Sequence, residues 1–413
     1  MKGRISKPSY SGMAAFRHRD FCFFYFGKTI AETVMQMVRV AIAYQIYDRT
    51  GKPMDLAYIG LATFAPAFGF ALFTGYIADL FDRKLVLSIC YAVMMLSALL
   101  FLAFTLSHTA QVWPAYVIMA LMGTGRAFYQ PAANSLVPNL VALEVFPNAV
   151  AWNTSTLKVS QIVGPALGGV LYLAGPEVIY ATAATVLIIA VAITAMIRTR
   201  TGRTGKEPIS LKSLFAGISY VYQKKIILGA ITLDLFVVVL GGVTALLPVY
   251  AKDILQVGPA GAGLLLSAMA AGGVVTALAL TQVSMARNVG YTLFFSMFIY
   301  GGATVAFGLS SWFLISLIAM ATLGGADMVN VYIRQTLIQI ATPDSMRGRV
   351  SSVSTIFTGA SNEIGEFRAG ATASLIGVVP AVVFGGLASI LVTVACWRLF
   401  PTLLKVQRLD SAL

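Results

Sequence analysis

Twelve mainly apolar runs follow one another along the chain, separated by short polar stretches. Each run has at least the roughly 20 residues that a helix needs to cross the hydrocarbon core of a bilayer, so each predicts one membrane-spanning helix. The runs cover approximately residues 21–47, 56–80, 85–106, 112–137, 147–173, 177–197, 226–250, 259–283, 289–309, 312–340, 349–375 and 378–400.

One polar connection is longer than the others and divides the runs into two sets of six. It covers residues 198–225 and is rich in Lys, Arg and Gly. We therefore expect an all-α membrane protein with an N-terminal six-helix bundle (1–197), a basic cytoplasmic linker (198–225) and a C-terminal six-helix bundle (226–413).

A pattern of residues at fixed spacing in the first half, which we call the repeat frame, is repeated in the second half. Gly164 and Gly169 of the fifth run correspond to Gly365 and Gly370 of the eleventh. Internal repeats of this kind are typical of transporters whose pseudo-symmetric halves enclose a central site. The first copy contains a proline kink and the second contains two carboxylates, and we expect this asymmetry to be the working part of the molecule.

Composition supports a membrane location and excludes other classes. The 413 residues are 58% hydrophobic and 11% charged, whereas soluble domains carry roughly 25% charged residues. The net charge of +13 does not indicate nucleic-acid binding, because the basic residues lie between apolar runs rather than on one face of a domain. The three cysteines are far apart, so neither a disulfide framework nor a metal site is expected.

The distribution of Lys and Arg predicts the orientation. With the N-terminus in the cytoplasm, the segments on that side hold 20 of the 29 basic residues, and the opposite loops hold three. Because basic residues concentrate in cytoplasmic loops, both termini are predicted to be cytoplasmic. We expect a multi-pass protein of the inner (plasma) membrane whose basic loops also attract anionic lipids of the bilayer.

The loop between the second and third runs contains a carboxylate and a basic pair. Asp79 follows Gly75 by four residues, and Arg83 and Lys84 follow Asp79 by four and five residues. These four residues suit a charge latch between neighbouring helices that breaks and re-forms as two halves rock. The alternative is that the loop charges only set the orientation in the membrane.

The fifth run contains Gly164-Pro165, followed by two further glycines. Pro165 removes one backbone hydrogen bond and bends the helix, while the glycines allow another helix to approach closely. We therefore predict that Gly164 and Pro165 form a conformational seal between helices and bind no ligand. A plain packing kink is the alternative.

Eleven charged residues lie within the predicted spans at least six residues from either end. Each costs at least about 2.5–3.5 kcal/mol near the bilayer centre, so such groups face a partner or a watery cavity. They are Lys28, Glu32, Arg39, Arg126, Lys158, Asp234, Asp327, Arg334, Glu363, Glu366 and Arg368. Lys28 and Arg39 are expected to extend toward opposite membrane surfaces. For Arg334, Asp234 and Arg368, a structural ion pair is as good an interpretation as a function.

The in-span charges predict a cavity with a cationic wall and an anionic wall, because those of the first half sum to +3 and those of the second half to −2. The predicted substrate-binding and coupling residues are Glu32, Arg126, Lys158, Asp327, Arg334, Glu363 and Glu366. Glu363 and Glu366 lie one helical turn apart, so their charges repel, and one is expected to hold a proton near neutral pH. We predict Glu366 as the proton-coupling residue and Glu363 as its modulator; a structural bridge from Glu366 to another span is the alternative.

The motifs and the six-plus-six repeat resemble the major facilitator superfamily. Its signature for the loop after the second span is Gly-x-x-x-Asp-(Arg)-x-Gly-Arg-Lys, from which this chain departs at Leu80 and Asp82. The Gly164-Pro165 motif is similar to that of the antiporter branch. The stretches 125–132, 342–350 and 361–367 resemble the enterobactin-exporter-like group, which includes macrolide-efflux transporters.

No phosphate-binding loop, nucleophile elbow or pair of metal ligands at a suitable spacing occurs in the sequence, so neither an enzyme nor a bound cofactor is expected. We predict a monomeric secondary transporter that works by alternating access, uses the proton gradient and binds a small molecule. The resemblance implies export of a siderophore-like or amphipathic drug-like solute. Import of a ferric chelate or small nutrient is an alternative, and so is a non-transporting receptor or assembly factor on the same scaffold.

Overall fold

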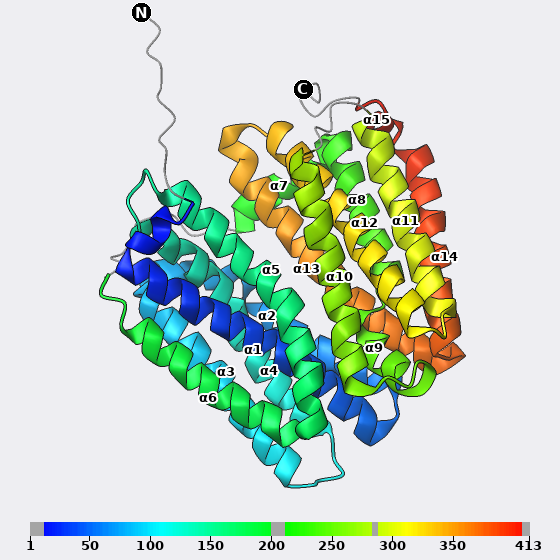
Figure 1. The fold of residues 1–413 in the computed structure, drawn as a ribbon. Helices are drawn as coiled ribbons and strands as arrows, with labels where there is room; N and C mark the ends of the chain where they lie inside the picture. Colours follow the sequence, from blue (N-terminus) through cyan, green and yellow to red (C-terminus); the bar gives the residue numbers. More distant parts are fainter. Residues whose placement is uncertain (1–11, 200–210, 283–287, 407–413) are drawn as a thin grey trace, which may run out of the picture.

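The structure, a computed structural model, describes residues 12–199, 211–282 and 288–406, except for the side chains of residues 71–73, 75–76, 78–79, 211–214 and 344–345. The first half contains the long helices α1 (Arg19–Thr50), α2 (Pro53–Leu80), α3 (Arg83–Leu106), α4 (Trp113–Leu136), α5 (Phe146–Leu171) and α6 (Pro176–Ala195). The second half contains α8 (Lys225–Gly241), α10 (Gly258–Gln282), α11 (Val289–Leu309), α12 (Phe313–Ile340), α13 (Asp344–Ile376) and α14 (Val378–Leu399) (Figure 1). The twelve-helix membrane fold predicted from the apolar runs is confirmed.

Successive long helices run in opposite directions, so the molecule has two ends. The linker end is the one where α1 begins, α6 ends and the short helix α7 (Leu211–Gln223) lies. The far end is the opposite one, which holds the short connections that follow α1, α3 and α5.

Polarity is unevenly distributed among the long helices. Among the described residues, eight helical segments are long and apolar enough to cross a membrane: α3, α5 with the turn after it, α6, the region from α8 to Ile254, α10, α11, α12 and α14. Helices α1 and α13 are outside this set, and together they contain six of the eleven in-span charges. The charged groups are therefore concentrated on one helix of each half.

The two halves repeat the same internal packing. α2 packs on α4 in the first half, and α10 packs on α12 in the second. At each contact a glycine meets a backbone carbonyl: Gly123 lies against Thr63, and Gly324 lies against Met269. A side chain at either glycine would overlap that carbonyl, so the glycines determine how closely the helices approach.

The seventh span is broken, and the prediction of one continuous helix over residues 226–250 is wrong. α8 ends at Gly241, and the chain continues through short turns, including α9 (Leu247–Val249), to a π-helical turn at Tyr250–Ile254. Two consecutive glycines, Gly241 and Gly242, lie at the break, and glycine is a poor helix former.

Arg368 of α13 stabilises the broken end of α8. Its Nε donates to the carbonyl oxygen of Val239 at 3.1 Å, and one of its terminal nitrogens donates to that of Gly242 at 3.4 Å. Because lipid offers no hydrogen bonds to backbone groups, the carbonyls at a helix break need partners from the protein. This contact favours the structural interpretation of Arg368.

The stretch 198–225, expected to be a polar linker throughout, contains a packed helix. α7 contacts α8 and α13, and Val221 joins Val350 and Val353 of α13 in a buried apolar cluster. Gly217 lies directly against the backbone carbonyl of Arg349. The second half therefore begins in space at residue 211, before the predicted boundary at 226.

The two halves meet mainly through two pairs of helices, α5 with α10 and α2 with α13. α5 and α10 lie side by side in Figure 1. Gly169 of α5 lies against the carbonyl of Pro259, and Gly263 of α10 lies against that of Pro165. In the other pair, Gly370 lies against the carbonyl of Pro53. These close backbone contacts are all near the far end.

Candidate functional site

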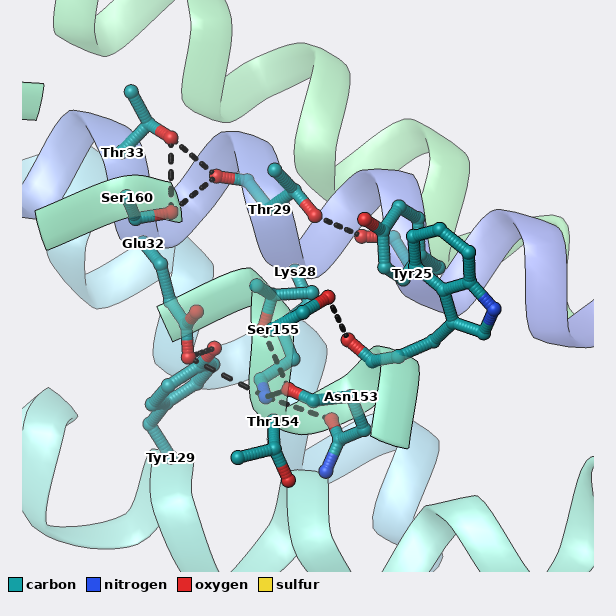
Figure 2. A network of polar contacts seen from close by, with 12 residues as sticks. Tyr25, Lys28, Thr29, Glu32, Thr33, Tyr129, Asn153, Thr154, Ser155 and Ser160 are labelled. Atoms are coloured by element: carbon teal, nitrogen blue, oxygen red, sulfur yellow. Dashed lines mark hydrogen bonds and ion pairs between the residues drawn. The ribbon is translucent and has the colours of Figure 1, made fainter. Parts of the chain in front are cut away.

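A buried polar network joins α1, α4 and α5 inside the first half (Figure 2). The ammonium of Lys28 lies 3.5 Å from Glu32 Oε1. It also donates to the backbone and side-chain oxygens of Asn153 at 2.9 and 2.7 Å. The hydroxyl of Tyr129 donates to Glu32 at 3.0 Å. Because Lys28 and Glu32 are only 3% and 4% exposed, the network is enclosed by the helices of this half.

This network changes two sequence predictions. The expectation that Lys28 extends toward a membrane surface is wrong, because Asn153 gives its ammonium two acceptors in the interior. Glu32, a predicted substrate or coupling residue, lies in the same enclosed network. Its Oε2 atom has no hydrogen-bond partner among the described residues.

The second half contains a corresponding network between α8, α12 and α13. Arg334 lies 3.5 Å from Asp234 and donates to the hydroxyls of Ser354 and Thr358 at 2.9 and 3.0 Å. Asn330 donates to the other oxygen of Asp234. The ion-paired side chains are 2% and 5% exposed, so this placement favours the structural interpretation of Arg334 and Asp234.

Two further ion pairs cross from one half to the other near the middle of the molecule. Arg39 of α1 binds Glu366 of α13, and Arg126 of α4 lies 3.8 Å from Glu363. The arginine side chains are 45% and 47% exposed, and the carboxylates are 14% and 15% exposed. The expected direction of Arg39, toward a membrane surface, is wrong because its side chain turns inward to the opposite half.

Glu366 connects three parts of the molecule. Besides Arg39, its Oε1 atom accepts a hydrogen bond from the hydroxyl of Thr244 at 2.9 Å, just after the break in α8. It also borders a small pocket with a cavity volume of about 50 Å³. The pocket is lined by Val238, Gly242, Val243, Thr244, Met269, Tyr300, Leu323, Asn362 and Glu366. A change in the charge of Glu366 would therefore act on the contact between the halves, on the helix break and on the pocket together.

Lys158 and Asp327 remain without a direct partner. Lys158 on α5 is exposed, Asp327 on α12 is partly exposed, and neither has a hydrogen bond or ion pair among the described residues. The charges of Asp234, Arg334 and Lys158 all lie within electrostatic range of Asp327. Of the predicted site residues, the structure thus places Arg126, Lys158, Asp327, Glu363 and Glu366 where the halves face each other.

The far end is closed by polar and apolar contacts between the halves. Lys252 donates to Asp48 at 2.6 Å, and the Tyr47 hydroxyl donates to Asp253. Beside these pairs lies an apolar cluster formed by Tyr44, Tyr172, Ala251, Val257 and Ala262. Together with the glycine contacts of α5 and α10, these residues form what we call the far-end seal. Gly164 and Pro165 belong to this region, with Gly164 packed on Gln36 of α1 and the carbonyl of Pro165 against Gly263.

The predicted latch is only partly described. The side chain of Asp79 lies outside the described residues, and Gly75 carries none. Arg83 donates to the carbonyl of Ser135 at 2.8 Å, at the end of α4. Lys84 donates to two carbonyls at the end of α6, Ala195 at 2.8 Å and Ile197 at 2.6 Å. Both cations therefore bind carbonyls at the C-terminal ends of helices, where the helix dipole favours positive charge.

Sequence reasoning missed several partners, although one signal was available. Asn153 and Ser354 occupy equivalent positions in the repeat frame that pairs Gly164 with Gly365, and each accepts from the basic residue of its own network. Comparing polar residues at equivalent positions of the two halves would have found this pair.

The geometry allows binding and proton exchange but offers no site for covalent chemistry. Among the described residues, no group of three His, Cys, Asp or Glu side chains could hold a metal ion. What the interface between the halves provides is a set of paired and unpaired charges, partly open to water, beside a pocket.

Comparison with known proteins agrees with this arrangement. A family model described as "Transmembrane secretion effector" matches residues 10–412. Macrolide efflux protein A of Streptococcus pyogenes is 23% identical over 391 residues, covering 93% of this chain and 96% of its own. The enterobactin exporter EntS of Citrobacter koseri is 24% identical over 343 residues, covering 81% of each chain. A Na⁺, Li⁺, K⁺/H⁺ antiporter of Planococcus maritimus is 26% identical over 313 residues, covering 67% of this chain and 72% of its own.

A solved structure shares the fold at low sequence identity. The crystal structure of a bacterial homolog of the human lysosomal transporter Spinster, in an inward-facing and unoccupied conformation, covers 97% of each chain. The TM-score is 0.68 at 15% sequence identity. At this identity the likeness concerns the arrangement of the helices alone.

Proposed function

Because the chain belongs to the transmembrane secretion effector family of major facilitator transporters, we propose that it is a proton-coupled exporter of a small amphipathic molecule. It is a multi-pass membrane protein and not an enzyme. Alternating access, the coupling ion, the direction and the cargo are parts of the proposal.

The observation that carries the proposal is the set of contacts made by Glu366. This carboxylate binds Arg39 of the opposite half and Thr244 beside the break in α8. Protonation removes the negative charge and so weakens both contacts. Because the Arg39 side chain is 45% exposed, water can reach the pair, and a proton can be exchanged without opening the interior of either half.

The far-end seal supports a transport cycle in which the two ends open alternately. In the orientation predicted from the basic loops, the linker end faces the cytoplasm and the far end faces outward. The structure then corresponds to a state closed to the outside, in which solute enters from the cytoplasm. In a proton-driven export cycle, Glu366 takes its proton from the outside in the outward-open state and releases it to the cytoplasm, and the charge left on Glu366 then re-forms the pair with Arg39 in the state closed to the outside. Glu363 modulates this step through its own pair with Arg126.

The proposed cargo is a siderophore-like or amphipathic drug-like molecule. The activities named for two relatives, macrolide efflux and enterobactin export, support this class. The activity named for a third, cation/H⁺ antiport, supports coupling to protons. We propose that the protein works as a monomer, because each polypeptide contains both halves and the complete interface between them.

The proposal is tested with purified protein in liposomes, using enterobactin, erythromycin and norfloxacin as solutes. We expect a proton gradient to drive accumulation of at least one of them by the wild-type protein. Glu366→Gln keeps the shape of the side chain but removes its charge, so it should abolish accumulation while retaining counterflow, which needs no net proton movement. Glu144→Gln, on an exposed loop, is the matched control and should behave as wild type.

Three outcomes would contradict the proposal. If Glu366→Gln loses both counterflow and folding, the residue is structural. If it retains gradient-driven accumulation, coupling lies elsewhere. If the wild-type protein moves none of the solutes under either direction of the gradient, a non-transporting role is favoured, and uptake driven in the opposite direction would identify an importer.

A further inference from the structure

Among the described residues near the middle of the molecule, the charges where the halves face each other are paired except for one cation and one carboxylate. Arg39 binds Glu366 and Arg126 binds Glu363, so these four side chains balance one another. The enclosed networks of the two halves balance their charges internally as well. Lys158 and Asp327 are left over, on opposite halves and of opposite sign.

Lys158 lies on the face of α5 that is turned toward the second half. Ile162, one turn further along, accepts a hydrogen bond through its carbonyl from Ser267 of α10 at 2.6 Å. Pro165 and Gly169, on the same face, contact the start of α10. Lys158 continues this face by one turn toward the linker end. Its exposed ammonium is therefore directed at the region between the halves.

Asp327 lies beside the pocket that borders Glu366. Leu323, one turn earlier on α12, lines that pocket together with Tyr300 of α11. Val238 and Met269 add apolar surface to the same lining. A ligand at Asp327 would thus have an anionic anchor next to an aromatic and aliphatic wall.

We propose that Lys158 and Asp327 are the recognition pair for an amphipathic zwitterion. Its ammonium group binds Asp327, its carboxylate or other anionic group binds Lys158, and its apolar body lies between the halves against the wall that includes Tyr300 and Leu323. This inference rests on the proposed transport function and names its substrate class. It also separates recognition from coupling, which is assigned to Glu366.

Charge complementarity selects this ligand class over singly charged ones. A cation would pair with Asp327 but leave Lys158 facing a ligand without an acceptor of matching charge. An anion would do the reverse. Both site charges gain a charge-assisted hydrogen bond only when the ligand carries both signs. A molecule lacking one of them leaves a partly desolvated charge unpaired, which is the usual source of strong discrimination.

The test uses three charge forms of one molecule. Norfloxacin carries an amine and a carboxylate; its methyl ester keeps only the amine, and its N-acetyl derivative keeps only the carboxylate. Binding of each to the purified protein is measured at neutral pH. We expect the wild-type protein to bind the zwitterion about tenfold or more tightly than either derivative, which corresponds to about 1.4 kcal/mol.

The variants should remove this preference selectively. Asp327→Asn should bind norfloxacin and the N-acetyl form equally, because the site no longer contains a carboxylate that binds the amine. Lys158→Gln should bind norfloxacin and the ester equally, for the converse reason. The double reversal Lys158→Glu with Asp327→Lys exchanges the two charges and should restore part of the preference. The midpoint of thermal unfolding of each variant verifies folding, and Glu144→Gln is the control for a charge removed elsewhere.

Several results would overturn the inference. They are equal binding of the three forms by the wild-type protein, binding of none of them, and an unchanged preference in both single variants. These results leave the proposed function intact if gradient-driven transport of any solute still depends on Glu366. If transport does not depend on Glu366 but the wild-type protein still prefers the zwitterion, the coupling role of Glu366 is contradicted and the recognition role of Lys158 and Asp327 is supported.

Discussion

The ion pairs within each half differ from those between the halves. Lys28–Glu32 and Arg334–Asp234 join residues of one half, and no side chain in either pair is more than 5% exposed. Arg39–Glu366 and Arg126–Glu363 connect the halves, and their arginines are almost half exposed.

This difference separates a structural role from a working role. A buried ion pair is held by the helices around it, and removing one partner leaves an uncompensated charge in the interior. A pair that water reaches contributes little to stability, since the solvent replaces the lost partner. Only the second kind can break and re-form at each step of a cycle. The comparison therefore predicts rigid halves and an adjustable contact between them.

The largest effect is expected from breaking the enclosed pair of the second half. Asp234→Ala should lower the free energy of unfolding by about 3–5 kcal/mol, because Arg334 is left buried and charged. The measurement is unfolding of the purified protein in detergent. The double variant Asp234→Ala with Arg334→Leu removes both charges and should recover most of the loss. A loss below about 1 kcal/mol in the single variant would remove the distinction between the two kinds of pair.

The enclosed network of the first half should respond less strongly. Asn153→Ala removes one of the three oxygen atoms around the Lys28 ammonium, which keeps the backbone oxygen of residue 153 and Glu32. Loss of this charge-assisted hydrogen bond should lower the free energy of unfolding by about 1–3 kcal/mol. The control is Thr154→Ala, whose exposed hydroxyl bonds only to its own helix at Val150. Equal free energies of unfolding for Asn153→Ala and Thr154→Ala would show that the network adds nothing to the stability of this half.

The Arg39–Glu366 pair between the halves should matter little for stability but strongly for transport. Arg39→Gln should change the free energy of unfolding by less than about 1 kcal/mol, because its side chain is partly in water. It should nevertheless impair gradient-driven accumulation, since Glu366 loses its partner in the first half. Arg19→Gln, at the linker end, is the control. A destabilisation as large as that of Asp234→Ala would place this pair among the structural ones.

The smallest effect is expected at the far-end seal. Lys252→Gln removes an exposed pair with Asp48 worth about 0.2–1 kcal/mol. The population open at the far end should then rise about one-and-a-half- to fivefold. Labelling of a cysteine placed at Ala251, inside the apolar cluster, reports this opening. In protein that retains Lys252, added salt should increase labelling because salt screens the pair with Asp48. If labelling changes neither with salt nor with the substitution, the closure of the far end is assigned to the glycine contacts alone.

Much of the fold could be predicted from the sequence because lipid imposes a simple rule. Every backbone polar group must be satisfied within a span, so runs of apolar residues identify helices such as α11 closely. The break in α8 escaped prediction because the run around Gly241 is as apolar as its neighbours. Its stability depends on Arg368, which is distant in sequence. The helix α7 was not predicted because the apolar face that packs on α13 is short and lies within a mainly polar stretch of sequence.

The candidate site was predicted only in part. The sequence identifies which charges lie in the membrane, but helical spacing gives the direction of a side chain and not the helix that it meets. Glu363 and Glu366 were correctly placed one turn apart, but their partners depend on how the halves approach. For the same reason Arg39 was assigned to a membrane surface and Lys28 was not paired with Asn153.

The contact between Arg368 and the end of α8 also constrains the order of assembly during synthesis. The carbonyl of Val239 accepts from a residue 129 positions later in the chain. When α8 first enters the bilayer, the ribosome has not yet made α13, and the carbonyls at the break lack this guanidinium. The second half therefore matures late: α8 reaches its final form only after nearly the whole chain has been translated. Until then, the insertion machinery or water at the membrane surface must supply the hydrogen-bond donors that Arg368 later provides.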